Sequence, residues 1–219
     1  MILNLSNISL SFDDKTLFTD VSLTINQGDF IVIRGASGSG NSSFLRLLNR
    51  LNEPTSGTIS SDSTLLTNTE VTAYRRRVGY VQQTPILISG TVHENLTLPF
   101  SYKSAVTNAP DRSRLEADLV EFNLVDVKLD DSADNLSVGQ KQRIALIRTL
   151  LTEPDIILGD EPTSALDPES RTIVEDRLRK VNREQKTTII LVTHLEFDPG
   201  DTVARQFTID KGQLREVTA

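Results

Sequence analysis

The stretch GASGSGNSS, from Gly35 to Ser43, has the glycine spacing of a phosphate-binding loop, G-x-x-x-x-G-K-[ST]. In such a loop, backbone N–H groups and the N-terminus of the following helix surround phosphate oxygens. The hydroxyl of Ser42 is placed to bind Mg²⁺, whereas Asn41 stands where the pattern has a positively charged lysine. A tight strand-to-helix turn without a ligand is the alternative interpretation of this stretch alone. The candidate phosphate-binding residues are Gly35, Ala36, Ser37, Gly38, Ser39, Gly40, Asn41, Ser42 and Ser43.

A second candidate is a pair of acids at the end of an apolar stretch. Ile156–Glu161 is typical of a buried strand whose C-terminal tip carries Asp160 and Glu161. Ligands bind at the carboxyl ends of strands in open α/β sheets. At such an edge, Asp160 would belong to the shell of a metal ion and Glu161 would polarise an attacking water. Paired acids at a strand end also serve as helix caps, which is the alternative.

The flanking segments predict the elements that position these residues. The apolar strand FIVIR runs into the glycine loop, and apolar residues from Phe44 to Leu51 follow at helical spacing. Strand, loop and helix in this order form the context that a phosphate site requires. Further apolar stretches, VGYVQQ at 78–83, DIILGDE and TTIILVTH, alternate with helices. The sequence therefore predicts a mainly parallel sheet covered by helices on both faces.

The remaining segments complete the predicted organisation. The alternating stretches ILNLSNISLSF and TDVSLTI predict an N-terminal antiparallel β subdomain, and RQFTIDKGQLREV predicts a hairpin that turns at Lys211-Gly212. Residues 85–136 are poorer in apolar residues and are interrupted by Pro99 and Pro110. We therefore expect an inserted, mainly helical subdomain at 85–136 within a single domain that spans residues 1–219.

Composition excludes several classes of protein. The chain has 219 residues, a formal net charge of −7 and no cysteine, which excludes disulfide frameworks and cysteine–zinc sites. A nucleic-acid-binding protein usually carries a basic face, and RRR at 75–77 is the densest basic run, so no nucleic-acid partner is expected. No apolar run approaches the roughly 20 residues of a membrane-spanning helix. If the protein works at a membrane, another chain must hold it there.

Three further motifs accompany the loop and the acid pair. LSVGQ at Leu136–Gln140 precedes the acids, SALD at Ser164–Asp167 follows them, and His194 ends the next apolar strand. Over essentially the whole chain, this order resembles the ATP-binding subunits of ABC transporters. The resemblance implies an α/β P-loop NTPase core, with an N-terminal antiparallel β subdomain and an inserted helical subdomain, that binds ATP and Mg²⁺.

The resemblance also implies a role for each matching residue. Gln83 would reach Mg²⁺ and the attacking water, with Gln82 as the alternative. Glu161 would be the catalytic base and His194 would sense the γ-phosphate, although a histidine at a strand end is often structural. Phe12 would stack on adenine, a contact typically worth roughly 1–3 kcal/mol, unless it is a core phenylalanine. The metal ligands implied are Ser42, Gln83 and Asp160.

Oligomeric state and partners follow from the signature motif. The resemblance implies that each ATP lies between the glycine loop of one chain and LSVGQ of the other, so that ATP binding closes a two-fold homodimer. The residues implied on the LSVGQ side of this ATP site are Ser137, Gly139, Gln140 and the aspartate Asp167. The dimer would drive a membrane-spanning permease docked near the glutamine loop, which places the chain in the cytoplasm, peripheral on the inner face of the cell membrane. The run GTVHENLTLPF is similar to small ATPases linked to iron or other metal efflux.

Two other functions stay open at this point. A soluble ABC protein acting on ribosomes or DNA is one, although the tandem cassettes, coiled-coil insertions and basic arms typical of that class are not visible. A nucleotide-binding regulatory subunit without turnover is the other, and Asn41 favours it.

Three positions depart from the family pattern. Val138 replaces the second glycine of the signature, and Gly159 stands before Asp160 where a bulkier apolar residue is usual, so we expect looser packing there. Asn41 is the serious departure, because it keeps a donor but no charge. The sequence therefore predicts weak ATP binding and very slow hydrolysis.

Overall fold

Two separate sheets make up the β-structure of the computed structural model, which describes residues 1–13, 15–36, 38–102, 105 and 107–217. The first sheet is antiparallel and has the strand order β2-β1-β4-β5. It confirms the predicted N-terminal antiparallel unit, and adds two strands that the sequence did not indicate. Its strands are β1 Leu3–Phe12, β2 Lys15–Ile25, β4 Ser56–Ser61 and β5 Thr64–Leu65.

The second sheet has six strands in the order β10-β9-β3-β8-β7-β6. Strands β9 to β6 are parallel to one another, and only the β9–β10 hairpin is antiparallel. Every residue of β7 and β8 is buried, as their continuous apolar sequences predicted. The strands are β3 Phe30–Gly35, β6 Val78–Val81, β7 Ile156–Asp160, β8 Thr188–Val192, β9 Ala204–Asp210 and β10 Gln213–Val217.

Helices connect and cover these strands. The helix that follows the glycine loop begins where the sequence predicted, and helix α2 was not predicted. The α-helices are α1 Asn41–Leu48, α2 Val71–Arg77, α3 Val92–Thr97, α4 Arg112–Glu121, α5 Val138–Leu150 and α6 Pro168–Gln185. Short 3₁₀ turns lie at η1 Leu66–Asn68, η2 Leu98–Ser101 and η3 Ala133–Asn135.

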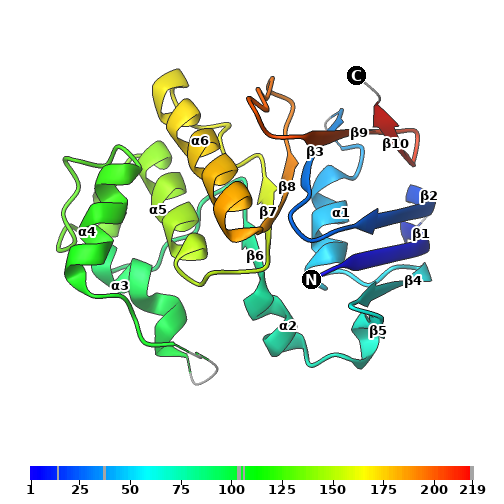
Figure 1. The fold of residues 1–219 in the computed structure, drawn as a ribbon, viewed down its shortest axis with the longest axis horizontal. Coiled ribbons are helices and arrows are strands. Elements are labelled where there is room, and N and C mark those ends of the chain that lie inside the picture. The colour runs from blue at the N-terminus through cyan, green and yellow to red at the C-terminus, as the bar shows by residue number, and fades with distance from the viewer. Residues whose placement is uncertain (14, 37, 103–104, 106, 218–219) are drawn as a thin grey trace.

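The alternating side chains of β3 enter two different cores. Ile31 and Ile33 pack with α1 and the antiparallel sheet, whereas Phe30 and Val32 pack with α3, α4, α5 and α6. Figure 1 shows these four helices on one side of the six-stranded sheet and α1 with β1 and β2 on the other. The sheet is therefore covered on both faces, as predicted, and its strand ends remain available for a site.

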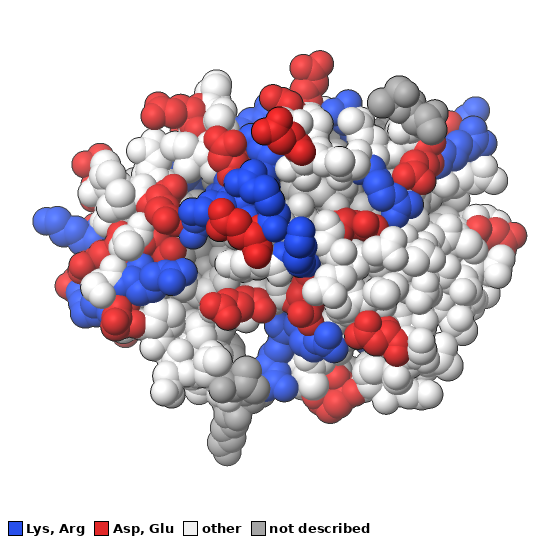
Figure 2. All heavy atoms as spheres, in the orientation of Figure 1, with Lys and Arg blue, Asp and Glu red and all other residues white. Residues whose placement is uncertain are grey.

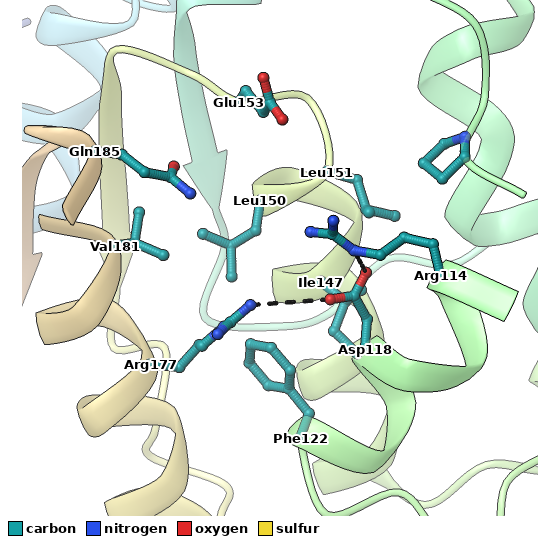
Figure 3. A pocket seen from close by; sticks show the side chains of 11 residues that line it. Arg114, Asp118, Phe122, Ile147, Leu150, Leu151, Glu153, Arg177, Val181 and Gln185 are labelled. Atoms are coloured by element: carbon teal, nitrogen blue, oxygen red, sulfur yellow. Dashed lines mark hydrogen bonds and ion pairs between the residues drawn. The ribbon is translucent and has the colours of Figure 1, made fainter.

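A charged cluster joins α4 to α6 at the rim of a cavity of about 130 Å³ (Figure 3). Arg114 Nε donates to Asp118 Oδ2 at 3.1 Å. From α6, Arg177 Nη2 lies 2.6 Å from Glu121 Oε2 and 3.9 Å from Asp118 Oδ1. Asp118 is thus a buried carboxylate shared between the two helices.

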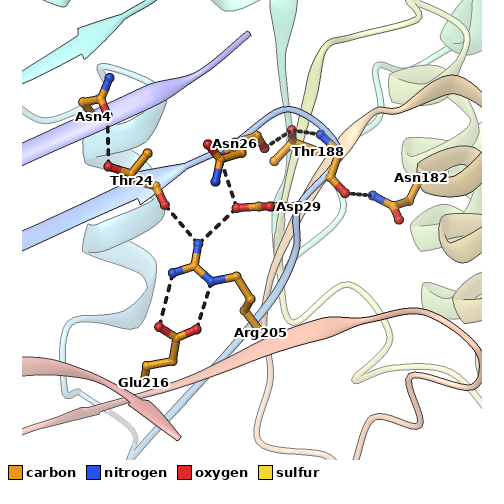
Figure 4. A network of polar contacts seen from close by, with 9 residues as sticks. Asn4, Thr24, Asn26, Asp29, Asn182, Thr188, Arg205 and Glu216 are labelled. Atoms are coloured by element: carbon orange, nitrogen blue, oxygen red, sulfur yellow. Dashed lines mark hydrogen bonds and ion pairs between the residues drawn. The ribbon is translucent and has the colours of Figure 1, made fainter. Parts of the chain in front are cut away.

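A second polar network ties the C-terminal hairpin to the start of β3 (Figure 4). Arg205 Nη1 donates to Asp29 Oδ2 and to the Thr24 carbonyl, each at 3.0 Å. Its Nε and Nη2 donate to the Glu216 carboxylate at 2.9 and 3.3 Å. Because β3 leads into the glycine loop, this network fixes the strand that carries the loop.

Figure 2 shows one face of the molecule with its charged side chains coloured. Basic and acidic side chains are interspersed across this face. Within the described part of the chain, no helix is both long enough and apolar enough to cross a membrane.

Candidate active site

The glycine loop links β3 to α1 with a backbone that requires glycine at its last position. Gly40 is the N-cap of α1 and has a φ of 103°, which side-chain-bearing residues rarely adopt. A Cβ on Gly40 would also lie 2.7 Å from Cε1 of Phe18. The loop is therefore held against β2 of the antiparallel sheet. Ser37 lies outside the described residues.

Asn41 is the first residue of α1 and its side chain folds back over the loop. Its Nδ2 donates to the Gly35 carbonyl at 3.1 Å, and its Oδ1 accepts from Ser39 Oγ at 3.2 Å. Among the described contacts, no lysine or arginine forms a hydrogen bond or ion pair with residues 35–36 or 38–43. The amide thus closes the loop internally and brings no positive charge to it.

Oxygen donors suited to a hard cation meet beside the loop. Ser42 Oγ donates to Asp160 Oδ1 at 2.9 Å, and Asp160 is only 5% exposed at the end of β7. No cluster of three or more acidic or histidine side chains forms a metal cage within the described ranges. Mg²⁺ is commonly held by one or two carboxylates together with substrate phosphates, so a hydroxyl and a single carboxylate fit this ion.

Glu161 is the centre of a second group of contacts. Its Oε1 lies 2.9 Å from His194 Nδ1, and its Oε2 accepts from Gln83 Nε2 at 2.9 Å. Its backbone has a φ of 49°, a region that costs of order 1–3 kcal/mol for a non-glycine residue and often marks functional sites. The structure thus brings together the three residues predicted to be catalytic.

Strand order explains why these residues meet. Gln83, Glu161 and His194 follow β6, β7 and β8, which are adjacent parallel strands. The glycine loop follows β3, the next strand in the sheet. All four strands end at the same edge, where open α/β sheets bind ligands.

The signature motif starts α5 through a capping box. Ser137 is the N-cap, and its Oγ accepts from the Gln140 N–H while the Gln140 side chain accepts from the Ser137 N–H. A Cβ on Gly139 would lie 3.4 Å from Ala165 O, so the start of α5 packs against the SALD segment. No described hydrogen bond joins the signature to the glycine loop of the same chain.

Asp167 has a structural task in this chain. It is the N-cap of α6, and its Oδ1 accepts from the Ser170 N–H at 2.9 Å. This backbone hydrogen bond holds the pKa of the Asp167 carboxyl below its usual range. The carboxylate is therefore ionised as a helix cap, next to the signature.

Phe12 ends β1 with 46% of its surface exposed. This exposure does not fit the alternative of a core phenylalanine. The ring is free to receive a flat ligand, so adenine stacking stays a prediction for it.

The expectation of looser packing at Gly159 is wrong. A Cβ there would lie 2.8 Å from Cδ2 of Leu191 and 2.9 Å from Cγ of Pro162. Neighbouring side chains already fill the space that a bulkier residue occupies in the family pattern. A larger residue at this position would force Leu191 or Pro162 to shift.

Two residues of the site were missed at the sequence level. Tyr80 donates from its hydroxyl to Asp160 Oδ2 at 3.0 Å, and the buried Gln142 donates to the Gln82 carbonyl at 3.2 Å. The second contact connects the signature helix to the glutamine segment. Both depend on β6 lying beside β7 and α5, an adjacency that sequence spacing does not reveal.

Comparison with known proteins identifies related sequences. Residues 18–164 match the family described as ABC transporter. The methionine import ATP-binding protein MetN of Photobacterium profundum is 41% identical over 203 residues, which are 90% of this chain and 58% of that protein. MetN of Mannheimia succiniciproducens is 39% identical over 224 residues, covering 98% of this chain and 64% of the relative. The chain thus spans about three fifths of the length of these relatives.

Solved structures show the same fold. A dimeric post-hydrolysis state of the ATP-binding cassette MJ0796, bound to ADP and Pi, superposes with a TM-score of 0.82 at 30% identity and covers 99% of both chains. A bacterial Atm1-family ABC exporter with ATP bound gives a TM-score of 0.86 at 26% identity, over 98% of this chain and 38% of that one. The predicted α/β P-loop NTPase fold is therefore confirmed.

Proposed function

Because the chain belongs to the ABC transporter family, we propose that it is an ATP-binding and ATP-hydrolysing subunit that powers a transporter. The observation that carries this proposal is the contact of Glu161 with both Gln83 and His194 beside the Ser42–Asp160 pair. These are the groups that positioning a water and a metal–phosphate complex requires. The iron- or metal-efflux subtype stays a prediction, because the relatives described above are named for methionine import.

The chain's own residues would divide the work as follows. Glu161 accepts a proton from the attacking water, while Gln83 and His194 orient its two carboxylate oxygens. Backbone N–H groups of the glycine loop receive phosphate oxygens at the N-terminus of α1. Ser42, Asp160 and Gln83 would hold Mg²⁺, which neutralises phosphate charge when it is bound.

Asn41 lowers the expected activity of this loop. A unit charge pair at about 4 Å is worth roughly 4 kcal/mol at an effective dielectric of about 20. Loss of one preorganised donor typically costs roughly 10²–10³ in rate, and loss of a charged one costs at least as much. The folded-back amide of Asn41 fits the same proposal, because its donor is already used by the Gly35 carbonyl. This residue is also what favours a non-hydrolysing regulatory subunit as the second candidate.

A second copy of the chain would complete the site. Ser137 is exposed at the N-terminus of α5, and Val138 beside it has 60% of its surface exposed. A helix N-terminus with free N–H groups is suited to a phosphate of the facing subunit. A γ-phosphate that bridges two chains gives ATP a higher affinity for the closed dimer than for the open one.

The membrane partner would dock beside the glutamine segment. Ile86 and Tyr102 expose 60% and 58% of their surfaces there. A groove of about 600 Å³ lies nearby, lined in part by Pro99, Phe100 and the basic run 75–77. An exposed apolar surface rimmed by charges is typical of a protein-binding site. A permease at this place would hold the chain on the inner face of the membrane, and methionine and metal ions are the substrates to test with it.

Binding of a fluorescent ATP analogue tests the nucleotide site directly. The parent chain should bind weakly in the presence of Mg²⁺, and the Asn41→Lys variant should bind at least about tenfold more tightly because it restores the missing charge. An Asn41→Gln variant serves as the neutral control and should behave like the parent. No binding to any of the three folded proteins would contradict the proposal.

A further inference from the structure

Tyr80 lies on the strand next to the one that ends in Asp160. In the parallel pairing of β6 with β7, Tyr80 is opposite Leu158, two residues before Asp160. Side chains two residues apart on a strand point to the same face. Tyr80, Leu158 and Asp160 therefore share the face that packs against α1, and Tyr80 contacts the core on that side.

The two hydrogen bonds to Asp160 leave its carboxylate one orientation. Oδ2 accepts from the Tyr80 hydroxyl at 3.0 Å, and Oδ1 accepts from Ser42 Oγ at 2.9 Å. The carboxylate is also 5% exposed, so water has little access to either oxygen. Rotation about the Asp160 side chain would break the contact with Tyr80 and remove Oδ1 from Ser42 at the same time.

We infer that Tyr80 is a positioning residue of the divalent-cation site, because it anchors Asp160 Oδ2 and so keeps Oδ1 beside Ser42, where a cation accompanying the nucleotide phosphates would bind. The inference rests on the proposed function. Tyr80 would not contact the cation itself. Groups that orient a metal ligand in this way typically contribute about 10–100-fold to metal affinity.

Tyr74 provides a matched control within the same chain. It is 4% exposed, belongs to the same core, and its hydroxyl donates to the Leu48 carbonyl at 2.6 Å. Replacing Tyr74 by phenylalanine removes a buried hydroxyl bond without touching Asp160. A purely structural role for Tyr80 would give the two substitutions the same consequences.

The test uses Mn²⁺ as the probe for the divalent cation and measures its affinity for the protein. Mn²⁺ is titrated into the protein in the presence of ATP, and free Mn²⁺ is followed by electron paramagnetic resonance. The parent, Tyr80→Phe and Tyr74→Phe are compared, each also with Asn41→Lys to strengthen nucleotide binding. Affinity for a fluorescent ATP analogue in EDTA gives the metal-free reference.

Tyr80→Phe should weaken Mn²⁺ binding by about 10-fold or more, with unchanged metal-free nucleotide affinity. Tyr74→Phe should leave both affinities unchanged. With Asp160→Asn already present, Tyr80→Phe should have no further effect on Mn²⁺, because the two residues act as one unit. The cycle also separates positioning from a general loss of folding, which circular dichroism monitors.

Unchanged Mn²⁺ affinity in a folded Tyr80→Phe protein that binds nucleotide would overturn the inference while leaving the proposed function intact. Equal weakening by Tyr74→Phe would overturn it as well. If neither the parent nor Asn41→Lys bound any nucleotide, the proposed function would fail, and the role of Tyr80 would fail with it.

Discussion

Asn41 holds the shape of the glycine loop without bringing a positive charge to it. The hydrogen bonds of its side-chain amide with Gly35 and Ser39 span the loop, so the backbone is held without a ligand. The sequence already showed that no positively charged side chain stands at this position, because the spacing of the pattern fixes the place of its lysine. The sequence did not show which way the side-chain amide of Asn41 points, because that depends on the folded geometry of the loop.

Gly159 gives a prediction at the same scale. Gly159→Ala should lower the free energy of unfolding by about 1–3 kcal/mol, because its Cβ would approach Leu191 and Pro162 too closely. Urea unfolding followed by circular dichroism measures this. Gly139→Ala is the control, since its Cβ would make only ordinary contacts at 3.4 Å. Equal stability of the two variants would show that the space at Gly159 is open.

The positions of the strands and helices along the sequence could be predicted more surely than which of these elements lie side by side. Apolar runs located β3, β7 and β8, and turn residues located the loop and the final hairpin. Strand β6 ends at Val81, two residues before the predicted end, so that Gln83 is free to reach Glu161. The pairing of β6 with β7 joins residues far apart in sequence, so spacing alone predicts neither the Gln83–Glu161 nor the Tyr80–Asp160 contact. Strands β4 and β5 were missed because their short polar sequences lack clear alternation.

Ser137 has two expected roles at the start of the signature helix α5, as its N-cap and as a contact to phosphate, and substitutions can test them separately. Ser137→Ala should lower the free energy of unfolding by about 1 kcal/mol, because it removes the cap of α5. It should also weaken ATP-dependent dimerisation, measured by size-exclusion chromatography with light scattering in the Asn41→Lys background. Thr91→Ala removes the capping box of α3 at a similar cost and should not affect dimerisation.

Ser137→Asp sharpens this comparison. Aspartate is a good N-cap, so stability should be preserved, whereas its negative charge should repel the phosphate of the facing subunit. Dimerisation of Ser137→Asp at the level of the parent background would rule out a phosphate contact at this residue.

Within the described part of the chain, two hydrophobic cores lie on opposite faces of the six-stranded sheet. Their existence followed from the alternation of strands and helices in the sequence, and the architecture was predicted on that basis. Helices α3 and α4 lie within residues 85–136, which we propose as the inserted subdomain. The contact of α4 with α6 could not be predicted, because it is made by charged side chains that sequence patterning assigns to solvent (Figure 3).

Asp118 makes this contact sensitive to pH. Burial raises the pKa of its carboxyl, with Arg114 opposing the shift. A group with a raised pKa in the folded state stabilises the fold at low pH, and this stabilisation is lost as pH rises through the folded-state pKa. Asp118→Asn lacks this loss, so its unfolding free energy relative to the parent should increase as pH rises from about 4 to about 7. Urea unfolding at a series of pH values measures the difference, and a constant or falling difference would contradict the assignment.

Steady-state Mg²⁺-dependent ATPase activity of the parent beside Asn41→Lys tests the central claim most directly. The lysine variant should turn over at least about 10²-fold faster than the parent, and Asn41→Lys combined with Glu161→Gln should lose that gain, which excludes a contaminating enzyme. Equal turnover of the parent and the lysine variant would contradict the claim that Asn41 impairs the loop. Silence of both, with Asn41→Lys folded and bound to ATP, would contradict hydrolysis by this subunit alone.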